Sequence, residues 1–147
     1  ASFATTLTIN GTATATGNWD VRITGITPTA QVGATDHVST PTFTTTSATF
    51  NVDLAYPGAT SSYQVAIKNN GNISAKLNSI TDLTSINAGA PTYITYAISG
   101  VAVNDILAVG ATATATVTTT WSASATTNPA GANKAATITF NYVQNTP

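Results

Sequence analysis

The chain contains no cysteine and no methionine, and ionisable side chains are scarce. Without cysteine no disulfide framework can form, so packing and strand pairing must supply the stability. Four Lys or Arg, five acidic residues, all of them Asp, and a single His give a formal net charge of −1. Charged residues make up 6% of the chain, against about 25% in an ordinary soluble domain. Because near-zero net charge promotes association, we expect copies of the chain or attached glycans to cover this surface.

The shortage of basic residues excludes two classes of partner. Proteins bind nucleic acid largely through Lys and Arg that neutralise phosphates, and anionic membrane surfaces attract clusters of the same residues. The chain offers four such residues, scattered along the sequence. No apolar run approaches the roughly 20 residues needed to span a bilayer. We therefore expect no nucleic-acid partner and no membrane span in the mature chain; the basic residues are Arg22, Lys68, Lys76 and Lys134.

The start of the chain indicates export. It begins with Ala1 and lacks Met, which is expected of a processed product, most simply one from which a secretory signal peptide has been removed. We therefore predict an extracellular or cell-surface protein. Two acceptor sequences, Asn10-Gly11-Thr12 and Asn72-Ile73-Ser74, would be usable on such a protein, although these tripeptides also arise by chance. Asn10 and Asn72 are therefore candidate N-glycosylation sites.

Few residues of the chain are candidates for catalysis or for metal binding. Zinc needs three or four His, Cys or carboxylate ligands, and the chain has one His, no Cys and no Glu. His37 lies beside Asp36 in a predicted loop with no nucleophile-elbow motif, so an exposed loop His is favoured over a catalytic base. A calcium site stays open, but no Asp-rich loop marks one. We expect no enzyme and no cofactor, and we interpret the isolated carboxylates as turn or solvated residues: Asp20, Asp36, Asp53, Asp82 and Asp105.

Alternation with period two predicts an all-β protein. Thr makes up about a fifth of the chain, and β-branched residues favour strands. From Phe3 to Gly25 apolar residues and glycines occupy nearly every odd position, which is typical of a strand with one buried face. This run is longer than a normal strand, so we expect breaks at Gly11 and Gly17.

Further alternating runs are separated by turn signals. The dipeptide Asn70-Gly71 predicts a tight hairpin between the runs at 63–67 and 73–77. Two segments, 27–46 and 126–134, are predicted loops. Many short strands in 147 residues predict one antiparallel β-sandwich domain. The other predicted strands cover residues 48–56, 94–98, 111–121 and 136–142, with a looser apolar patch over 101–107.

Two stretches resemble a known family. Tyr56-Pro57-Gly58 with residues 61–77 (SSYQVAIKNNGNISAKL), and residues 106–110 followed by ATATATVTTTW, are similar to turn-and-strand motifs of the TasA/camelysin type of biofilm-fibre subunit. The uncharged, Thr-rich composition is closer to the archaeal bundling pili of that family. The resemblance implies a jelly-roll-like sandwich whose N-terminal strand fills a groove in the next subunit, in fibres that bundle in biofilms. Some members are classed as metallopeptidases, but the His and Glu residues that this activity requires are missing here.

The resemblance divides the chain into a donor strand with its connection, residues 1–16, and one sandwich domain, residues 17–147. Within residues 1–10 the side chains that would enter a neighbouring subunit are Phe3, Thr5, Leu7 and Ile9, with mostly Thr between them. Burying each large apolar side chain contributes about 1.5–3 kcal/mol, and each ladder hydrogen bond about 0.5–1.5 kcal/mol. Association costs about 4–15 kcal/mol, so flanking contacts should contribute as well. A head-to-tail contact that does not close gives a filament.

Three alternatives stay open at this stage. The first 16 residues could instead pair within their own subunit. The chain could be a carbohydrate-binding or adhesin module with Trp19 and Trp121 in a stacking platform, although both share the parity of apolar neighbours, which favours core packing. It could also be a surface-layer or cell-wall domain. For the donor groove, residues 136–142 and 111–121 are candidate walls on pattern alone.

Overall fold

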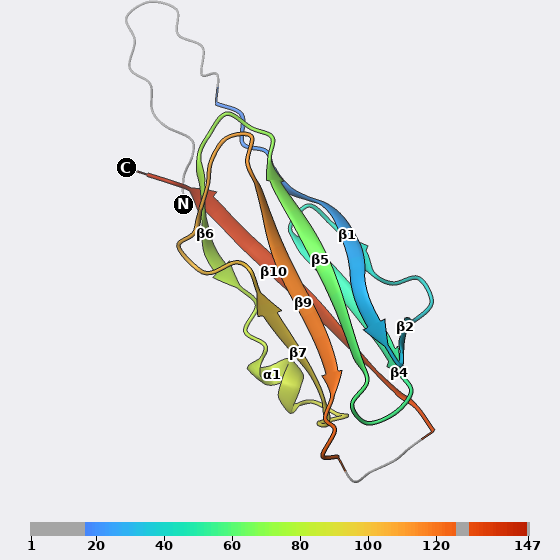
Figure 1. The fold of residues 1–147 in the computed structure, drawn as a ribbon. Helices are drawn as coiled ribbons and strands as arrows, with labels where there is room; N and C mark the ends of the chain where they lie inside the picture. The colour runs from blue at the N-terminus through green and yellow to red at the C-terminus, as the bar shows by residue number, and fades with distance from the viewer. Residues whose placement is uncertain (1–16, 126–129, 147) are drawn as a thin grey trace, which may run out of the picture.

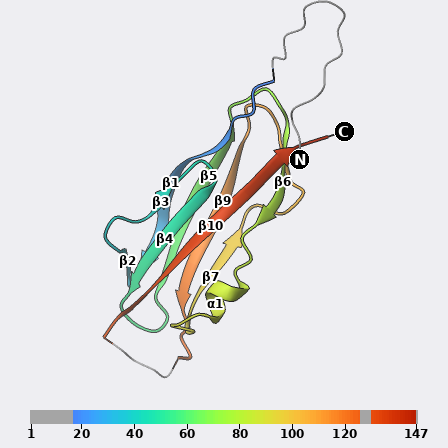
Figure 2. The same ribbon diagram turned by 180° about the vertical axis from the view of Figure 1, so that it is seen from behind.

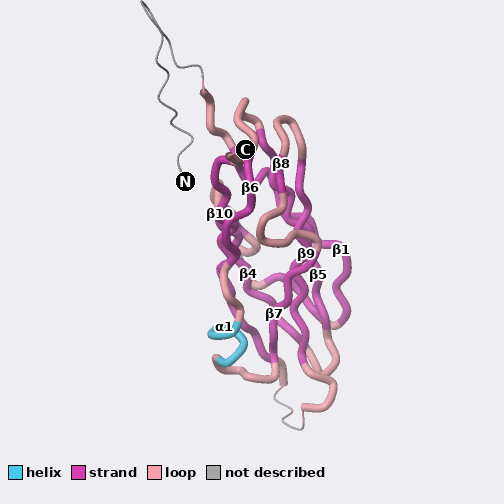
Figure 3. Tube along the Cα trace, turned by 90° about the vertical axis from the view of Figure 1, so that its left-hand side faces the viewer, coloured by secondary structure: helices cyan, strands magenta, loops and turns pink. Residues whose placement is uncertain are grey.

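Two antiparallel sheets packed face to face form a β-sandwich (Figure 1). The computed structural model describes residues 17–125 and 130–146, so the predicted donor residues and Asn10 lie outside the described part of the chain. Figure 3 shows the two layers edge-on, with β10 and β4 on one side and β1, β5 and β9 on the other. The predicted all-β antiparallel sandwich is confirmed.

The first sheet, sheet A, has four strands. In spatial order they are β1 (Val21–Val32), β5 (Thr60–Asn69), β9 (Thr112–Trp121) and β7 (Ile94–Ser99).

The second sheet, sheet B, is built around the longest strand, β10 (Ala132–Gln144). β4 (Ser47–Leu54) lies on one side of β10, and β6 (Ala75–Ile80) followed by β8 (Ile106–Leu107) lies on the other. Two short strands, β2 (Ala34–Asp36) and β3 (Thr42–Phe43), pair with the outer edge of β4. A single turn of helix, α1 (Thr84–Ala88), precedes β7.

The core lies between the sheets because each long strand alternates buried and solvent-facing residues, as strand geometry requires. β4 alternates along its whole length, and β5 and β9 along most of theirs. Trp121 is fully buried and stacks on Tyr93, with ring centroids 5.1 Å apart. This confirms the prediction that Trp121 packs in the core. Other large core side chains are Phe50, Leu54, Tyr63, Ile67, Leu77, Ile94, Ile138 and Phe140.

The predicted hairpin at Asn69-Asn70-Gly71 is wrong. The strand before it, β5, belongs to sheet A, and the strand after it, β6, belongs to sheet B, so the segment crosses between the sheets. The side chain of Asn69 is fully buried and holds this corner: its Nδ2 donates to the carbonyls of Ile73 (2.8 Å) and Leu107 (3.1 Å), and its Oδ1 accepts from the N–H of Gly71 (3.1 Å). The turn residues marked a change of direction but did not reveal that the next strand changes sheets.

The predicted loop over residues 27–46 is also wrong in part. β1 continues to Val32, and β2 and β3 follow. The pairing of β1 with β5 shifts register between Ile23 and Gly25 and again between Pro28 and Ala30. At the first shift the apolar residues of this strand move from odd to even positions, and the later half is exposed on both faces, so the alternation of residues 3–25 does not continue through it. At the predicted loop 126–134, β10 already begins at Ala132.

Candidate strand-acceptor groove

One edge of β10 has no described strand beside it near its C-terminal end. β4 pairs with β10 only from Ala132 to Thr139, whereas β6 pairs with the opposite side from Phe140 to Gln144. Figure 2 shows β10 running on past the start of β4. Among the described residues, sheet B is therefore one strand short at this end, on the side that β4 covers further down.

Strand geometry shows which backbone groups of β10 point toward this edge. Successive residues of an antiparallel strand direct their N–H and C=O to opposite sides. The N–H of Asn145 donates to Ser74 at 2.9 Å, on the β6 side, whereas that of Phe140 donates to Thr46 at 2.9 Å, on the β4 side. Tyr142 and Gln144 share the parity of Phe140. Their N–H and C=O groups therefore face the vacant position, where another strand can pair with them.

Beside this edge lies a small apolar groove, which we call the β10 groove. It contains a cavity of about 40 Å³ between β10 and the start of β1, room for about three water molecules. Its floor is formed by buried Ile23, Ile67 and Phe140. The complete lining is Trp19, Val21, Ile23, Thr45, Thr46, Ile67, Phe140, Asn141 and Tyr142.

The turn before β4 closes one end of the groove. Thr45 accepts from the N–H of Ile23 at 2.8 Å, and Thr46 accepts from Phe140, so this turn links both sheets. The hydroxyl oxygen of Thr44 accepts from the N–H of Ser47 at 3.0 Å and holds the turn in shape. The groove is therefore open toward the start of β1 and the end of β10.

The chain enters β1 at this open end. Asn18 donates its N–H to Oδ1 of Asn72 at 2.7 Å and accepts from the N–H of Asn72 at 3.0 Å. The candidate sequon residue Asn72 is exposed, and its side-chain oxygen anchors the segment that precedes β1. A Cβ added at Gly71 would lie 2.2 Å from the carbonyl oxygen of Asn18. Glycine is needed here for this close approach, and its φ is not positive.

Tyr142 lines the β10 groove, and the pKa of its phenol is raised. Burial raises the pKa of its phenol to about 12, and the carboxylate of Asp105 adds to the shift. The phenol is therefore neutral over the whole physiological range, and the groove wall stays uncharged. Of the two walls considered from sequence, residues 136–142 contribute Phe140, Asn141 and Tyr142, whereas residues 111–121 line no part of this cavity.

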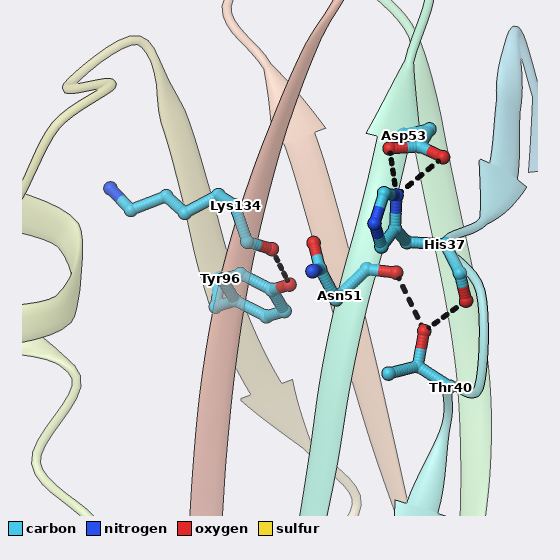
Figure 4. Close-up of polar contacts among 6 residues, drawn as sticks. All are labelled: His37, Thr40, Asn51, Asp53, Tyr96 and Lys134. Atoms are coloured by element: carbon cyan, nitrogen blue, oxygen red, sulfur yellow. Dashed lines mark hydrogen bonds and ion pairs between the residues drawn. The ribbon is translucent and has the colours of Figure 1, made fainter.

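Several polar residues away from the groove make contacts that hold the fold together (Figure 4). His37 lies in the loop after β2 with its side chain 44% exposed, and its Nδ1 is 3.0 Å from both carboxylate oxygens of Asp53. The hydroxyl of Thr40 donates to the backbone carbonyls of His37 (2.6 Å) and Asn51 (3.0 Å). The imidazole of His37 contacts Asp53 of β4, and the hydroxyl of Thr40 binds the carbonyl of Asn51 in the same strand. Both residues therefore hold this loop against β4.

The carboxylates divide between turns and strands. Asp82 and Asp105 are turn residues, as predicted: Asp82 accepts from the N–H of Thr84 at 3.0 Å, and Asp105 from that of Ala102 at 2.8 Å. The hydrogen bonds from Thr84 lower the pKa of Asp82. Asp36 and Asp53, in contrast, lie in strands. Across the described ranges, no group of three or more His, Cys, Asp or Glu residues is placed to hold a metal ion.

Lys134 is a buried cation that sequence reasoning did not single out. Its Nζ donates to three backbone carbonyls in the segment that runs from the end of α1 to the first residue of β7: Gly89 (2.7 Å), Pro91 (3.0 Å) and Ile94 (2.8 Å). Burial lowers the pKa of its amine, while the three carbonyls match the three N–H donors of an ammonium group. Lys134 thus fastens this segment to sheet B. Its place on the core-facing parity of β10, between apolar residues, was the signal available in the sequence.

No helix in the described residues has the length and apolarity needed to cross a membrane. Comparison with family models, curated proteins and solved structures finds no match for this chain.

Proposed function

We propose that the chain is the structural subunit of an extracellular filament that grows head-to-tail by donor-strand complementation. The observation that carries this proposal is the vacant strand position beside Tyr142 and Gln144, backed by the apolar β10 groove. The occupant is residues 1–10 of a neighbouring copy. The resemblance to TasA/camelysin fibre subunits and archaeal bundling pili supports the same function.

The donor sequence suits this position. A strand added to β10 has one face toward the core and one toward solvent. Residues 1–10 place Phe3, Leu7 and Ile9 on one face and mostly Thr on the other. The apolar face would cover the floor of the groove, and the Thr face would continue the polar outer surface of sheet B.

Hydrogen bonding favours an added strand as well. Main-chain groups of the donor would pair with those of Tyr142 and Gln144, which is how strand addition gains affinity. Oε1 of Gln144 is buried and has no hydrogen-bond partner within the described residues. Because an unpaired buried acceptor costs about 1–3 kcal/mol, an N–H from an incoming strand would stabilise it.

The connection is long enough for exchange between copies. The described chain starts at the open end of the groove, and residues 11–16 span at most about 20 Å when extended. A strand that leaves its own domain here and enters the same groove of the next copy makes a heterologous contact. Such a contact repeats without closing and builds a filament.

In this proposal the protein has no catalytic role, needs no cofactor and acts outside the cell. A carbohydrate-binding or adhesin module has less support, because Trp121 is buried and cannot present its ring to a glycan. A surface-layer domain would form sheets instead of fibres, which electron microscopy distinguishes.

The first test changes the two faces of the donor separately. Leu7→Asp places a charge on the face proposed to enter the groove, whereas Thr8→Asp places the same charge on the opposite face. We expect negative-stain images to show filaments for the parent chain and for Thr8→Asp, and isolated subunits for Leu7→Asp. Deletion of residues 1–10 should abolish filaments too. Filaments of normal length from Leu7→Asp or from the deletion would refute the proposal.

A further inference from the structure

The outer face of sheet A carries a regular row of hydroxyl groups. Every second residue of β9 is Thr, and all of these side chains lie on the face away from the core. We call this row the threonine ladder; it comprises Thr112, Thr114, Thr116, Thr118 and Thr120.

Neighbouring strands extend the ladder into a patch. Thr120 lies between Thr60 of β5 and Thr95 of β7 in the pairing register. One step along, Thr118 lies between Ser62 and Ala97, and its Oγ1 is 3.0 Å from the hydroxyl oxygen of Ser62. Short, mostly hydroxyl-bearing side chains therefore cover the middle of this face.

The patch is uncharged over most of its area. Across the four strands of sheet A the charged residues are Lys68 and Arg22, which are neighbours at the end of the ladder, where Lys68 pairs with Thr112. Arg22 forms an ion pair with Asp20 at 2.7 Å. Figure 1 looks onto this face, and no described element lies over it. Sheet B differs, because its outer face carries Asp53 and the His37 loop.

We propose that the threonine ladder is a lateral contact between two copies of this chain, through which filaments bundle. This inference rests on the proposed function but uses a surface separate from the β10 groove. The two copies would be related by a two-fold axis, so that the same patch serves both partners. A hydroxyl both donates and accepts a hydrogen bond, which makes a Thr surface complementary to itself. The charged residues lie at one end of the patch, so a two-fold axis through its middle brings no like charges together.

The size of the face suits a pair of copies. Four strands at about 4.8 Å spacing and ten residues at about 3.3 Å rise cover about 600 Å², with strand number and length from sheet A. Two such faces bury about 1,200 Å², the lower bound of specific protein interfaces. A glycan fits less well, because the aromatic residues of these strands, Tyr63, Tyr96 and Trp121, are all buried in the core.

Two matched substitutions test the ladder. Thr118→Lys places a charge one ladder position from its middle residue, Thr116, so that a two-fold axis through the middle would bring the lysines of both copies close together. Thr137→Lys is the control: Thr137 lies on the outer face of sheet B, and its Oγ1 makes the same 3.0 Å contact with a hydroxyl, that of Thr49. Far-UV circular dichroism and thermal melting of both variants check the fold. If Thr118→Lys does not fold, Thr116→Lys replaces it.

We expect bundled filaments from the parent chain and from Thr137→Lys, and single filaments of normal length from Thr118→Lys. Bundles from Thr118→Lys, or single filaments from the parent chain, would overturn the inference. If the parent chain forms no filaments at all, the proposed function fails. Sedimentation velocity of the soluble protein then tests the threonine ladder by itself. A dimer that Thr118→Lys abolishes and Thr137→Lys retains would support the ladder, and a parent chain that stays monomeric at high concentration would refute it.

Discussion

At the scale of single residues, stability depends on a few polar side chains buried with all their partners. Asn69 satisfies both ends of its amide inside the corner between the sheets. Lys134 uses its three donors on three carbonyls. Buried polar groups are tolerated when every donor and acceptor is paired and are costly otherwise. In a chain with so few charges, these two residues fix the segments that connect the strands.

Lys134→Met tests how much one of these buried polar side chains contributes to stability. The substitution keeps the apolar stem but removes the amine, so the carbonyls of Gly89, Pro91 and Ile94 lose their donor. We expect the free energy of unfolding to fall by about 1–3 kcal/mol, the cost of unsatisfied buried acceptors. Guanidinium denaturation followed by tryptophan fluorescence measures it. Lys76→Met on the solvent-facing side of β6 is the control and should change stability by at most about 0.5 kcal/mol; equal effects of both variants would contradict the role of Lys134.

At the scale of elements, the corner at residues 69–71 decides how the sandwich is connected. Gly71 packs against the backbone just before β1, where an added Cβ would lie 2.2 Å from the Asn18 oxygen and 2.8 Å from the Asp20 nitrogen. We expect Gly71→Ala to force this segment away and to cost about 1–3 kcal/mol, as overpacking does. Gly25→Ala is the matched control, because a Cβ there meets nothing within 4 Å. Thermal melting of both variants gives the comparison, and an unchanged melting temperature for Gly71→Ala would contradict this account of the corner.

The corner at residues 69–71 also shows which features of the fold could be predicted from the sequence. Alternation predicted most strands, because burying one face imposes period two on the residues themselves, as in β4, β5 and β9. The sequence did not show which sheet a strand joins, because Asn-Gly serves a hairpin and an inter-sheet corner equally well. The later part of β1 was missed because its apolar residues change from odd to even positions at the register shift, so they do not continue the earlier run. The β10 groove combines residues from β1, β5 and β10, so only its β10 wall could be suggested from pattern.

At the scale of the whole molecule, the proposed filament requires each subunit to give a strand and to receive one. These two roles belong to separate residues: Leu7 lies in the donor sequence, and Val21 lines the groove. Head-to-tail growth needs both roles in every copy. If the first residues instead pair within their own subunit, no strand passes from one copy to another. A mixture of two variants, each lacking one role, separates these possibilities.

Val21→Arg blocks the receiving role, because a charge buried in an apolar groove without a partner is strongly unfavourable. Leu7→Asp blocks the giving role. We expect each variant alone to be monomeric, and an equal mixture to form dimers that stop there, since the intact donor of Val21→Arg enters the intact groove of Leu7→Asp and no further site matches. Thr24→Arg, at an exposed position of the same strand, should polymerise like the parent chain. Sedimentation velocity resolves these species. A mixture that stays monomeric, while both variants are folded by circular dichroism, would mean that strands are not exchanged between copies.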